Sequence, residues 1–177
     1  MAKKGGGPNA PVNNLANNGV YVLMDEITMQ SCADCLKWIM NQNLAETRLP
    51  QLTIIINSPG GDVHAAFALI DTMKASTIPI KTVGLGLIAS CGFLIFIAGK
   101  KGSRILTPNT SILSHQYSWG SHGKEHELYA RVKEFELSTN RMIEHYKKCI
   151  GMSEKQIREI LLPPQDVWLS AKEAKKL

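Results

Sequence analysis

The chain has 177 residues, of which 44% are hydrophobic and 20% charged, and its formal net charge is +5. This length suits one domain with a sizeable core. The composition is ordinary for a globular protein, which excludes a chain that is disordered throughout. Much of the positive excess lies at the two ends, and no internal stretch interleaves basic with aromatic residues. We therefore predict no nucleic-acid partner.

The first 17 residues are rich in Gly, Pro and Asn and predict a flexible N-terminal arm ahead of a single domain over residues 18–177. The positive charge of the arm is not followed by an apolar stretch, so we expect no secretory signal. The most apolar segment, residues 83–98, is interrupted by glycines and is shorter than the roughly 20 residues of a membrane helix. It predicts a buried core segment and no membrane partner.

Four cysteines are present, and Cys32 and Cys35 form a C-x-x-C pair within a predicted helix that starts at Thr28. Such a pair is typical of a redox site or of half a zinc site. Because no second pair exists, small buried thiols are the favoured interpretation. Free thiols without a secretory signal predict a reducing compartment, the cytoplasm. We predict no metal site and no cofactor bound by this chain.

Predicted strands and helices alternate along the chain, which is typical of an α/β fold with a largely parallel sheet. Apolar and β-branched runs predict the strands, and the spacing of apolar residues together with capping residues predicts the helices. The strands are expected at residues 20–23, 51–56, 80–83, 104–106 and 111–114, and the helices at 28–44, 62–73, 91–98, 124–149 and 153–161.

Three polar residues stand at positions where an α/β fold could bring them together. Ser90 begins a predicted helix, where backbone N–H groups favour a developing negative charge, and His115 directly follows a predicted strand. Asp166 is the one aspartate after His115 in the chain. A serine becomes a nucleophile when a base takes its proton and an acid orients that base. The residues suggest a catalytic triad, and a helix-capping role for Ser90 is the alternative.

The loop over residues 57–61 ends in two glycines directly after a predicted buried strand. Glycine lets a backbone N–H group approach a ligand closely, because no Cβ intervenes. The N–H groups of Gly61 and Cys91 could therefore form an oxyanion hole. An ordinary tight turn is the alternative.

The predicted helix over about residues 124–149 carries apolar residues at alternating spacings of four and three, as in a packing seam. The first half of this helix is densely charged, so we expect the narrow seam to contact another subunit, with packing inside the chain as the alternative. The seam residues are Leu128, Val132, Phe135, Thr139, Met142, Tyr146 and Cys149.

Five segments, in this order, resemble motifs of the proteolytic subunit of the Clp protease, in the crotonase-like superfamily. They are residues 55–61, 70–73, 89–92, 106–109 with 115–116, and 166–171. One departure is Cys91, which stands where the nucleophile motif of the family has Met. The resemblance runs over nearly the whole chain from residue 20.

The resemblance implies a ββα spiral of the crotonase type with a protruding handle helix, which matches residues 124–149. It also implies that Ser90 is the acylated nucleophile, His115 the general base and Asp166 the residue that orients it, with the Gly61 and Cys91 amides as oxyanion donors. The implied assembly is a homo-oligomer of two stacked heptameric rings that cleaves unfolded polypeptides. A Clp-class AAA+ ATPase would deliver them, and ATP would be used only by that partner, since this chain has no phosphate-binding loop.

Three alternatives to this function remain open from the sequence. A compact, divergent form of this kind resembles phage-encoded members, so one alternative is a capsid-maturation protease of the same fold. Another is a different crotonase-like enzyme, although acyl-CoA hydratases need no Ser-His-Asp set and signal-peptide peptidases use a Ser-Lys pair and a membrane anchor. The third is a catalytically silent ring subunit.

Overall fold

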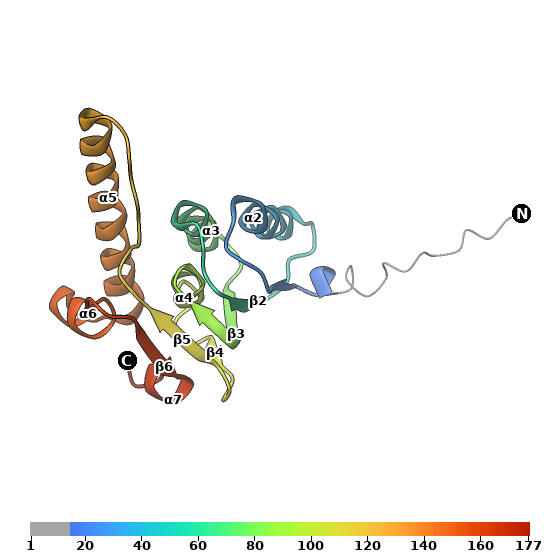
Figure 1. Ribbon diagram of the computed structural model, residues 1–177. Helices are drawn as coiled ribbons and strands as arrows, with labels where there is room; N and C mark the ends of the chain where they lie inside the picture. Colours follow the sequence, from blue (N-terminus) through green and yellow to red (C-terminus); the bar gives the residue numbers. More distant parts are fainter. Residues whose placement is uncertain (1–14) are drawn as a thin grey trace, which may run out of the picture.

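A six-stranded sheet forms the centre of the computed structural model, which describes residues 15–177 (Figure 1). The strand order is β1-β2-β3-β5-β6, and β4 pairs with β3 beside β5. Every pair is parallel except β5 with β6, so the predicted α/β class is confirmed. The strands are β1 (Val20–Leu23), β2 (Leu52–Ser58), β3 (Ile80–Ala89), β4 (Arg104–Leu106), β5 (Ser111–Ser114) and β6 (Val167–Ser170).

Helices α2, α3 and α4 lie together on one side of the sheet, and α5 projects away from the body of the molecule (Figure 1). The C-terminal helices α6 and α7 lie near the base of α5 and beside β6 (Figure 1). The helices are α2 (Met29–Leu44), α3 (Val63–Ala75), α4 (Cys91–Ile97), α5 (Glu125–Ile150), α6 (Glu154–Ile160) and α7 (Ala171–Ala174).

Capping side chains fix where the predicted helices begin. The side chains of Thr28, Asp62 and Ser153 each accept a hydrogen bond from the backbone N–H three residues on, at the starts of α2, α3 and α6. Each such bond satisfies an N–H group that would have no partner in the first turn. The predicted helix starts at these residues are confirmed.

The core lies between the sheet and the helices that cover it. Ile54 and Ile56 of β2, together with Leu69 and Ile70 of α3 and Ile95 of α4, are fully buried. Burial removes roughly 1.5–3 kcal/mol of unfavourable hydration per large aliphatic side chain. This core holds the C-terminal ends of β2, β3 and β5 in fixed positions under α4.

Strand β3 is longer than the sequence predicted, because it ends at Ala89 rather than at Val83. Its second half reads Gly-Leu-Gly-Leu-Ile-Ala, and the glycines hide the strand pattern. Gly86 has a φ of 67°, and around it β3 changes partners from β4 to β5. A glycine in a strand interior is typical of such a bend.

The last strand and helix, β6 and α7, were not predicted from the sequence. The β6 residues Val-Trp-Leu-Ser form a run of four between two proline residues and a short helix, too short for a clear alternation. The strand forms because it pairs antiparallel with β5, which is a long-range contact invisible to local pattern.

Residues 1–14 of the predicted N-terminal arm lie outside the described residues. Residues 15–17, which the prediction also placed in the arm, form a helical turn. The carbonyl of Ala16 accepts hydrogen bonds from the side chains of Trp38 (3.2 Å) and Gln42 (3.1 Å) on α2.

Helix α5 corresponds to the predicted handle helix, and Gly151 ends it in the left-handed conformation with a φ of 89°. The predicted seam divides into two halves. Met142, Tyr146 and Cys149 are buried within the chain, whereas Leu128 and Val132 are 37% and 44% exposed. The C-terminal half of the seam therefore follows the intramolecular alternative, and the N-terminal half is available to another molecule.

All four cysteines are free and buried, as favoured from the sequence. Within residues 15–177, no helix has both the length and the apolar character needed to cross a membrane.

Candidate active site

Ser90 occupies a strained turn between β3 and α4. Its φ of 52° and ψ of −119° make it the one non-glycine residue with a positive φ among residues 15–177. It stands at the cap position of α4, but its side chain makes no capping hydrogen bond. A non-glycine residue held in this region of φ and ψ costs about 1–3 kcal/mol of folding free energy, and it persists only where the surrounding structure enforces it. The helix-capping alternative is therefore wrong for Ser90.

Neighbouring backbone holds this turn in place. The Ser90 N–H donates to the carbonyl of Leu113 on β5 at 2.8 Å. On the other side lies Gly60, where an added Cβ would come within 2.7 Å of the Ser90 Cβ and 2.9 Å of the Ala89 carbonyl oxygen. The Gly60 N–H donates to Ser58 Oγ at 3.1 Å. Close backbone approach of this kind needs glycine.

The strand pairing brings His115 to Ser90. Ala89 at the end of β3 pairs with Leu113 of β5, so the residues that follow the two strands emerge at the same edge. His115 Nε2 lies 2.9 Å from Ser90 Oγ, and Nδ1 lies 2.6 Å from the carbonyl oxygen of Gln116. Because a carbonyl can only accept, Nδ1 carries the proton and Nε2 accepts from the Ser90 hydroxyl. This is the geometry of a general base.

Asp166 is placed beside His115 by the backbone but is not bonded to it. Ser114 pairs with Val167 in the antiparallel β5–β6 ladder, so the next pair outward is His115 with Asp166. The Asp166 side chain is exposed, and among the described residues the imidazole Nδ1 has Gln116 as its close partner instead. The sequence could not have indicated a backbone carbonyl in this position, because every residue has one.

The predicted oxyanion donors line the same cavity as Ser90 and His115, which measures about 120 Å³. Gly61 lies opposite Ile27 in an isolated parallel β-bridge. In this bridge the Ile27 N–H donates to the Gly60 carbonyl and the Asp62 N–H donates to the Ile27 carbonyl. The N–H of Gly61 itself is left without a backbone partner in the described chain, as is that of Cys91 in the first turn of α4. Two such donors beside a nucleophile are suited to bind a developing oxyanion.

Cys91 connects these two donors through its side chain. Its thiol donates to the Gly61 carbonyl at 3.2 Å. Burial raises the pKa of Cys91 to about 11, so the sulfur stays protonated near neutral pH. A protonated thiol is a weak nucleophile, and the reactive group of this cavity is the Ser90 hydroxyl.

Other histidines that the structure describes lie elsewhere. His64 faces Glu134 at 3.2 Å, and His145 is buried with its Nε2 donating to the Leu94 carbonyl at 2.9 Å.

Across residues 15–177, no three His, Cys, Asp or Glu side chains come together as a metal site would require.

A serine on a strained strand-to-helix turn, with an imidazole at its hydroxyl, is typical of serine hydrolases of the α/β class. Comparison with known proteins is more specific. The family model described as Clp protease matches residues 5–177. The chain belongs to the Clp protease family.

Several relatives support this assignment. An ATP-dependent Clp protease proteolytic subunit 1 from Chlamydia abortus is 33% identical over 85% of this chain and 78% of its own length. A proteolytic subunit 2 from Corynebacterium diphtheriae is 35% identical over 86% of this chain and 73% of its own. A solved structure of a ClpP1 mutant from Listeria monocytogenes has a TM-score of 0.81 and 28% identity, and covers 93% of this chain and 90% of that one.

These comparisons confirm three predictions from the sequence: the Clp protease family, the crotonase-like α/β fold, and an enzyme of the serine-type peptidase class.

Proposed function

We propose that this protein is an endopeptidase that cleaves polypeptides through an acyl-enzyme on Ser90. The observation that carries the proposal is the 2.9 Å contact between Ser90 Oγ and His115 Nε2 at a turn with a positive φ. The relatives named proteolytic subunits support peptide bonds as the substrate.

The chemistry follows from the geometry. His115 Nε2 takes the hydroxyl proton as Ser90 Oγ attacks the scissile carbonyl, and the Gly61 and Cys91 N–H groups stabilise the tetrahedral oxyanion. The imidazolium then gives the proton to the leaving amine, and the acyl group stays on Ser90. A water molecule, deprotonated by the same imidazole, releases the acyl group and restores the serine.

Asp166 is the proposed third member. What supports it is the β5–β6 register, because the pair that would follow Ser114 with Val167 is His115 with Asp166. The Gln116 carbonyl already fixes the tautomer of His115. The contribution of Asp166 is therefore to stabilise the imidazolium once it forms, after its exposed side chain rotates inward.

The proposed assembly is a homo-oligomer of two stacked heptameric rings, served by a Clp-class AAA+ ATPase in the cytoplasm. The N-terminal half of α5 supports a contact between subunits, because its exposed apolar side chains would be covered there. They are Leu128, Tyr129, Val132 and Leu137. The relatives are named as proteolytic subunits of ATP-dependent Clp proteases, which supports an ATPase partner.

A fluorophosphonate probe tests the proposed nucleophile. We expect one adduct per chain by intact mass, lost in Ser90→Ala and strongly reduced in His115→Ala. Ser121→Ala in an exposed loop and His126→Ala on the exposed face of α5 are matched controls that retain labelling. Labelling that survives Ser90→Ala would refute the mechanism.

Native mass spectrometry of the unlabelled protein tests the assembly separately. A large oligomer is expected. A stable monomer at micromolar concentration would contradict the ring proposal and would leave the assignment of Ser90 standing.

A further inference from the structure

The two residues on either side of His115 are bonded to consecutive carbonyls just beyond α6. Ser114 Oγ donates to the Leu161 carbonyl at 2.7 Å, and Gln116 Nε2 donates to the Leu162 carbonyl at 3.0 Å. Leu161 and Leu162 are buried and directly follow the last residue of α6, which lies near the base of α5 (Figure 1). The general base is therefore the middle residue of three, and both its neighbours are held by one helix end.

These carbonyls are available because of how α6 ends. Carbonyls at the end of a helix have no partner within it, and the next residues, Pro163 and Pro164, have no N–H group to continue the helix. The N–H groups of Leu161 and Leu162 both donate to the Ile157 carbonyl, at 2.9 Å each. Ile157 is fully buried, so the end of α6 is anchored in the core.

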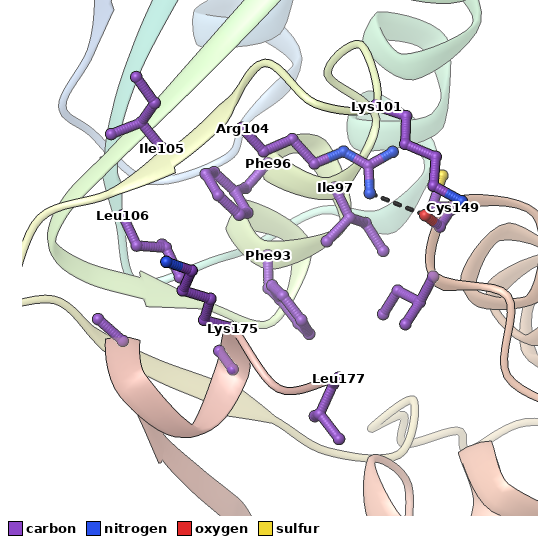
Figure 2. A pocket seen from close by; sticks show the side chains of 13 residues that line it. Phe93, Phe96, Ile97, Lys101, Arg104, Ile105, Leu106, Cys149, Lys175 and Leu177 are labelled. Carbon is purple, nitrogen blue, oxygen red and sulfur yellow. Dashed lines mark hydrogen bonds between the residues drawn. The ribbon is translucent and has the colours of Figure 1, made fainter.

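Tyr146 of α5 holds the Ser114 side of this arrangement. Its hydroxyl lies 3.1 Å from Ser114 Oγ. Because the single Ser114 proton goes to the Leu161 carbonyl, the Tyr146 hydroxyl is the donor. The Tyr146 ring is 1% exposed and packs against Phe93, with ring centroids 5.8 Å apart. Phe93 also lines a separate cavity of about 490 Å³ (Figure 2), which shares no lining residue with the cavity at Ser90. The Ser114 side is thus enclosed in the core.

The Gln116 side depends on a single side-chain bond. Residues 116–123 form no backbone–backbone hydrogen bond within the described chain. The Gln116 peptide must nevertheless keep one orientation, because its carbonyl accepts from His115 Nδ1 at 2.6 Å. Ser118 Oγ, at 3.4 Å from Nδ1, is a more distant neighbour. The bond from Gln116 Nε2 to the Leu162 carbonyl therefore decides where the Gln116 carbonyl points.

We propose that Gln116 and Ser114 are positioning residues for His115, and that together they hold its imidazole against Ser90 in the Nδ1–H tautomer. The inference rests on the proposed acylation of Ser90 and deepens it. A base must keep its reacting nitrogen within hydrogen-bond reach of the nucleophile. Displacements of about 1 Å near a reacting centre lower rates by about 10²-fold. Both residues act through the main chain beside His115, and neither side chain bonds to a reacting atom.

Helix capping is the alternative role for these bonds, since they also satisfy two carbonyls at the end of α6. Capping alone would change the stability of the protein and leave the imidazole of His115 as it is. A test therefore needs a measurement that responds to the position of the base and not to stability.

Steady-state kinetics with a fluorogenic peptide separate the two roles. Gln116→Met keeps the length of the side chain but removes its N–H donor. In this variant kcat should fall by about 10- to 10²-fold, while KM changes by less than about twofold, because substrate binding is retained and the acylation step is not. Ser114→Ala should lower kcat by about tenfold, also with little change in KM.

Two variants outside the site are matched controls. Gln30→Met removes an amide on α2 that donates to the Asp34 side chain, and Ser76→Ala removes a hydroxyl that donates to the Ile78 carbonyl. These changes match the losses in Gln116→Met and Ser114→Ala, but they lie away from His115. Both controls should keep kcat within about twofold of the unmodified protein.

Solid-state ¹⁵N NMR of protein labelled at histidine observes the tautomer directly, and His115→Ala identifies the signals of His115. At mildly alkaline pH the unmodified protein should show His115 protonated at Nδ1 alone. Gln116→Met should show both neutral tautomers, because the Gln116 carbonyl no longer keeps one direction. Gln30→Met should give the spectrum of the unmodified protein.

The outcomes distinguish the inference from the function on which it rests. Hydrolysis that survives in Ser90→Ala would refute the acylation mechanism and the positioning roles with it. If Ser90→Ala abolishes hydrolysis while Gln116→Met keeps its kcat and a single His115 tautomer, the positioning role is overturned and the acylation of Ser90 stands. Gln116 is exposed, whereas Ser114 is buried, so Gln116→Met decides the matter even if Ser114→Ala does not fold.

Discussion

Two histidines each lie beside a potential nucleophile and contact residues at or within α4, namely His115 beside Ser90 and His145 beside Cys149. At the start of α4, His115 contacts Ser90 Oγ at 2.9 Å. Near the C-terminal end of α5, the sulfur of Cys149 lies 3.7 Å from His145 Nδ1, and the same imidazole contacts the Leu94 carbonyl in the middle of α4. Both pairs join a base to a hydroxyl or thiol, yet only the first has the surroundings of a catalytic site.

The difference lies in what surrounds each pair. Ser90 opens into a cavity, sits on a strained turn and has two backbone N–H groups beside it. His145 is 2% exposed, and both its ring nitrogens are engaged, by the Leu94 carbonyl and by Lys74 Nζ. Burial raises the pKa of Cys149, which keeps it a thiol. A base near a nucleophile is thus insufficient, and backbone geometry distinguishes the catalytic pair from the structural one.

The largest expected effect tests the catalytic pair. Ser90→Ala and His115→Ala should each lower kcat/KM for a peptide substrate by about 10⁴-fold or more, because both remove the same acylation step. Their effects should be far from additive in the double variant. Peptide hydrolysis by purified protein measures this, and a multiplicative loss in the double variant would contradict a shared step.

The structural pair should appear in the pH dependence of stability. Burial lowers the pKa of His145 to about 4 from an ordinary value of 6.5. Between these values the unfolded chain binds a proton that the native state does not, so the free energy of unfolding decreases as pH falls from about 6.5 to about 4. The decrease attributable to this group is about 3 kcal/mol.

Urea unfolding at a series of pH values measures that slope. His145→Gln, which keeps an N–H donor, should lose this part of the pH dependence, while His115→Ala should retain it. An unchanged slope in His145→Gln would show that His145 is not buried as a neutral imidazole.

The strained turn can be tested with two glycines. In Gly60→Ala the new Cβ meets Ser90 Cβ at 2.7 Å, and the φ of 96° is unfavourable for alanine. We expect about a 10²-fold loss of fluorophosphonate labelling, since small misplacements at a reacting centre have effects of this size. Gly102→Ala has a similar φ of 83° but nothing within 4 Å of its Cβ. It should lower the melting temperature by a few degrees and leave labelling intact.

The variant Asp166→Asn tests whether Asp166 orients His115 or only stabilises its protonated form. Because the Gln116 carbonyl holds the Nδ1 proton, the tautomer survives the substitution, and only the stabilisation of the imidazolium is lost. We expect kcat to fall by roughly 10- to 10²-fold, less than in His115→Ala. A loss equal to that of His115→Ala would mean that Asp166, rather than Gln116, orients the imidazole during turnover.

The smallest effect is expected for Cys149→Ala. The sulfur is buried and protonated, so peptide hydrolysis should change by less than about twofold, with a loss of about 1 kcal/mol in stability from the small cavity left behind. Abolished hydrolysis in a folded Cys149→Ala protein would remove the distinction between the two pairs.

Most of the helices and strands, and the residue types of the candidate site, could be predicted from the sequence. Capping residues such as Asp62 and Ser153 are local signals, and they located helix starts correctly. The length of β3 and the existence of β6 depend on pairing with β5, which lies far along the chain. For that reason the glycine-rich second half of β3 was not predicted as a strand.

Within the site, the residue types could be predicted but their contacts could not. Ser90 and His115 were both expected at element ends, and the strand pairing does bring them together. The partner of His115 Nδ1 is a backbone carbonyl, which has no sequence signature. The fit of Gly60 against Ser90 is also visible only once both chain segments are placed.

The most direct test of the proposed site is a crystal structure of the protein after reaction with diisopropyl fluorophosphate, which loses fluoride when a serine oxygen attacks its phosphorus. We predict a bond from Ser90 Oγ to phosphorus, with the phosphoryl oxygen about 2.7–3.1 Å from the backbone nitrogens of both Gly61 and Cys91. The imidazole of His115 should stay beside the diisopropylphosphorylated Oγ. Phosphorus on any other residue, or a phosphoryl oxygen directed away from both amides, would contradict the proposed catalytic site.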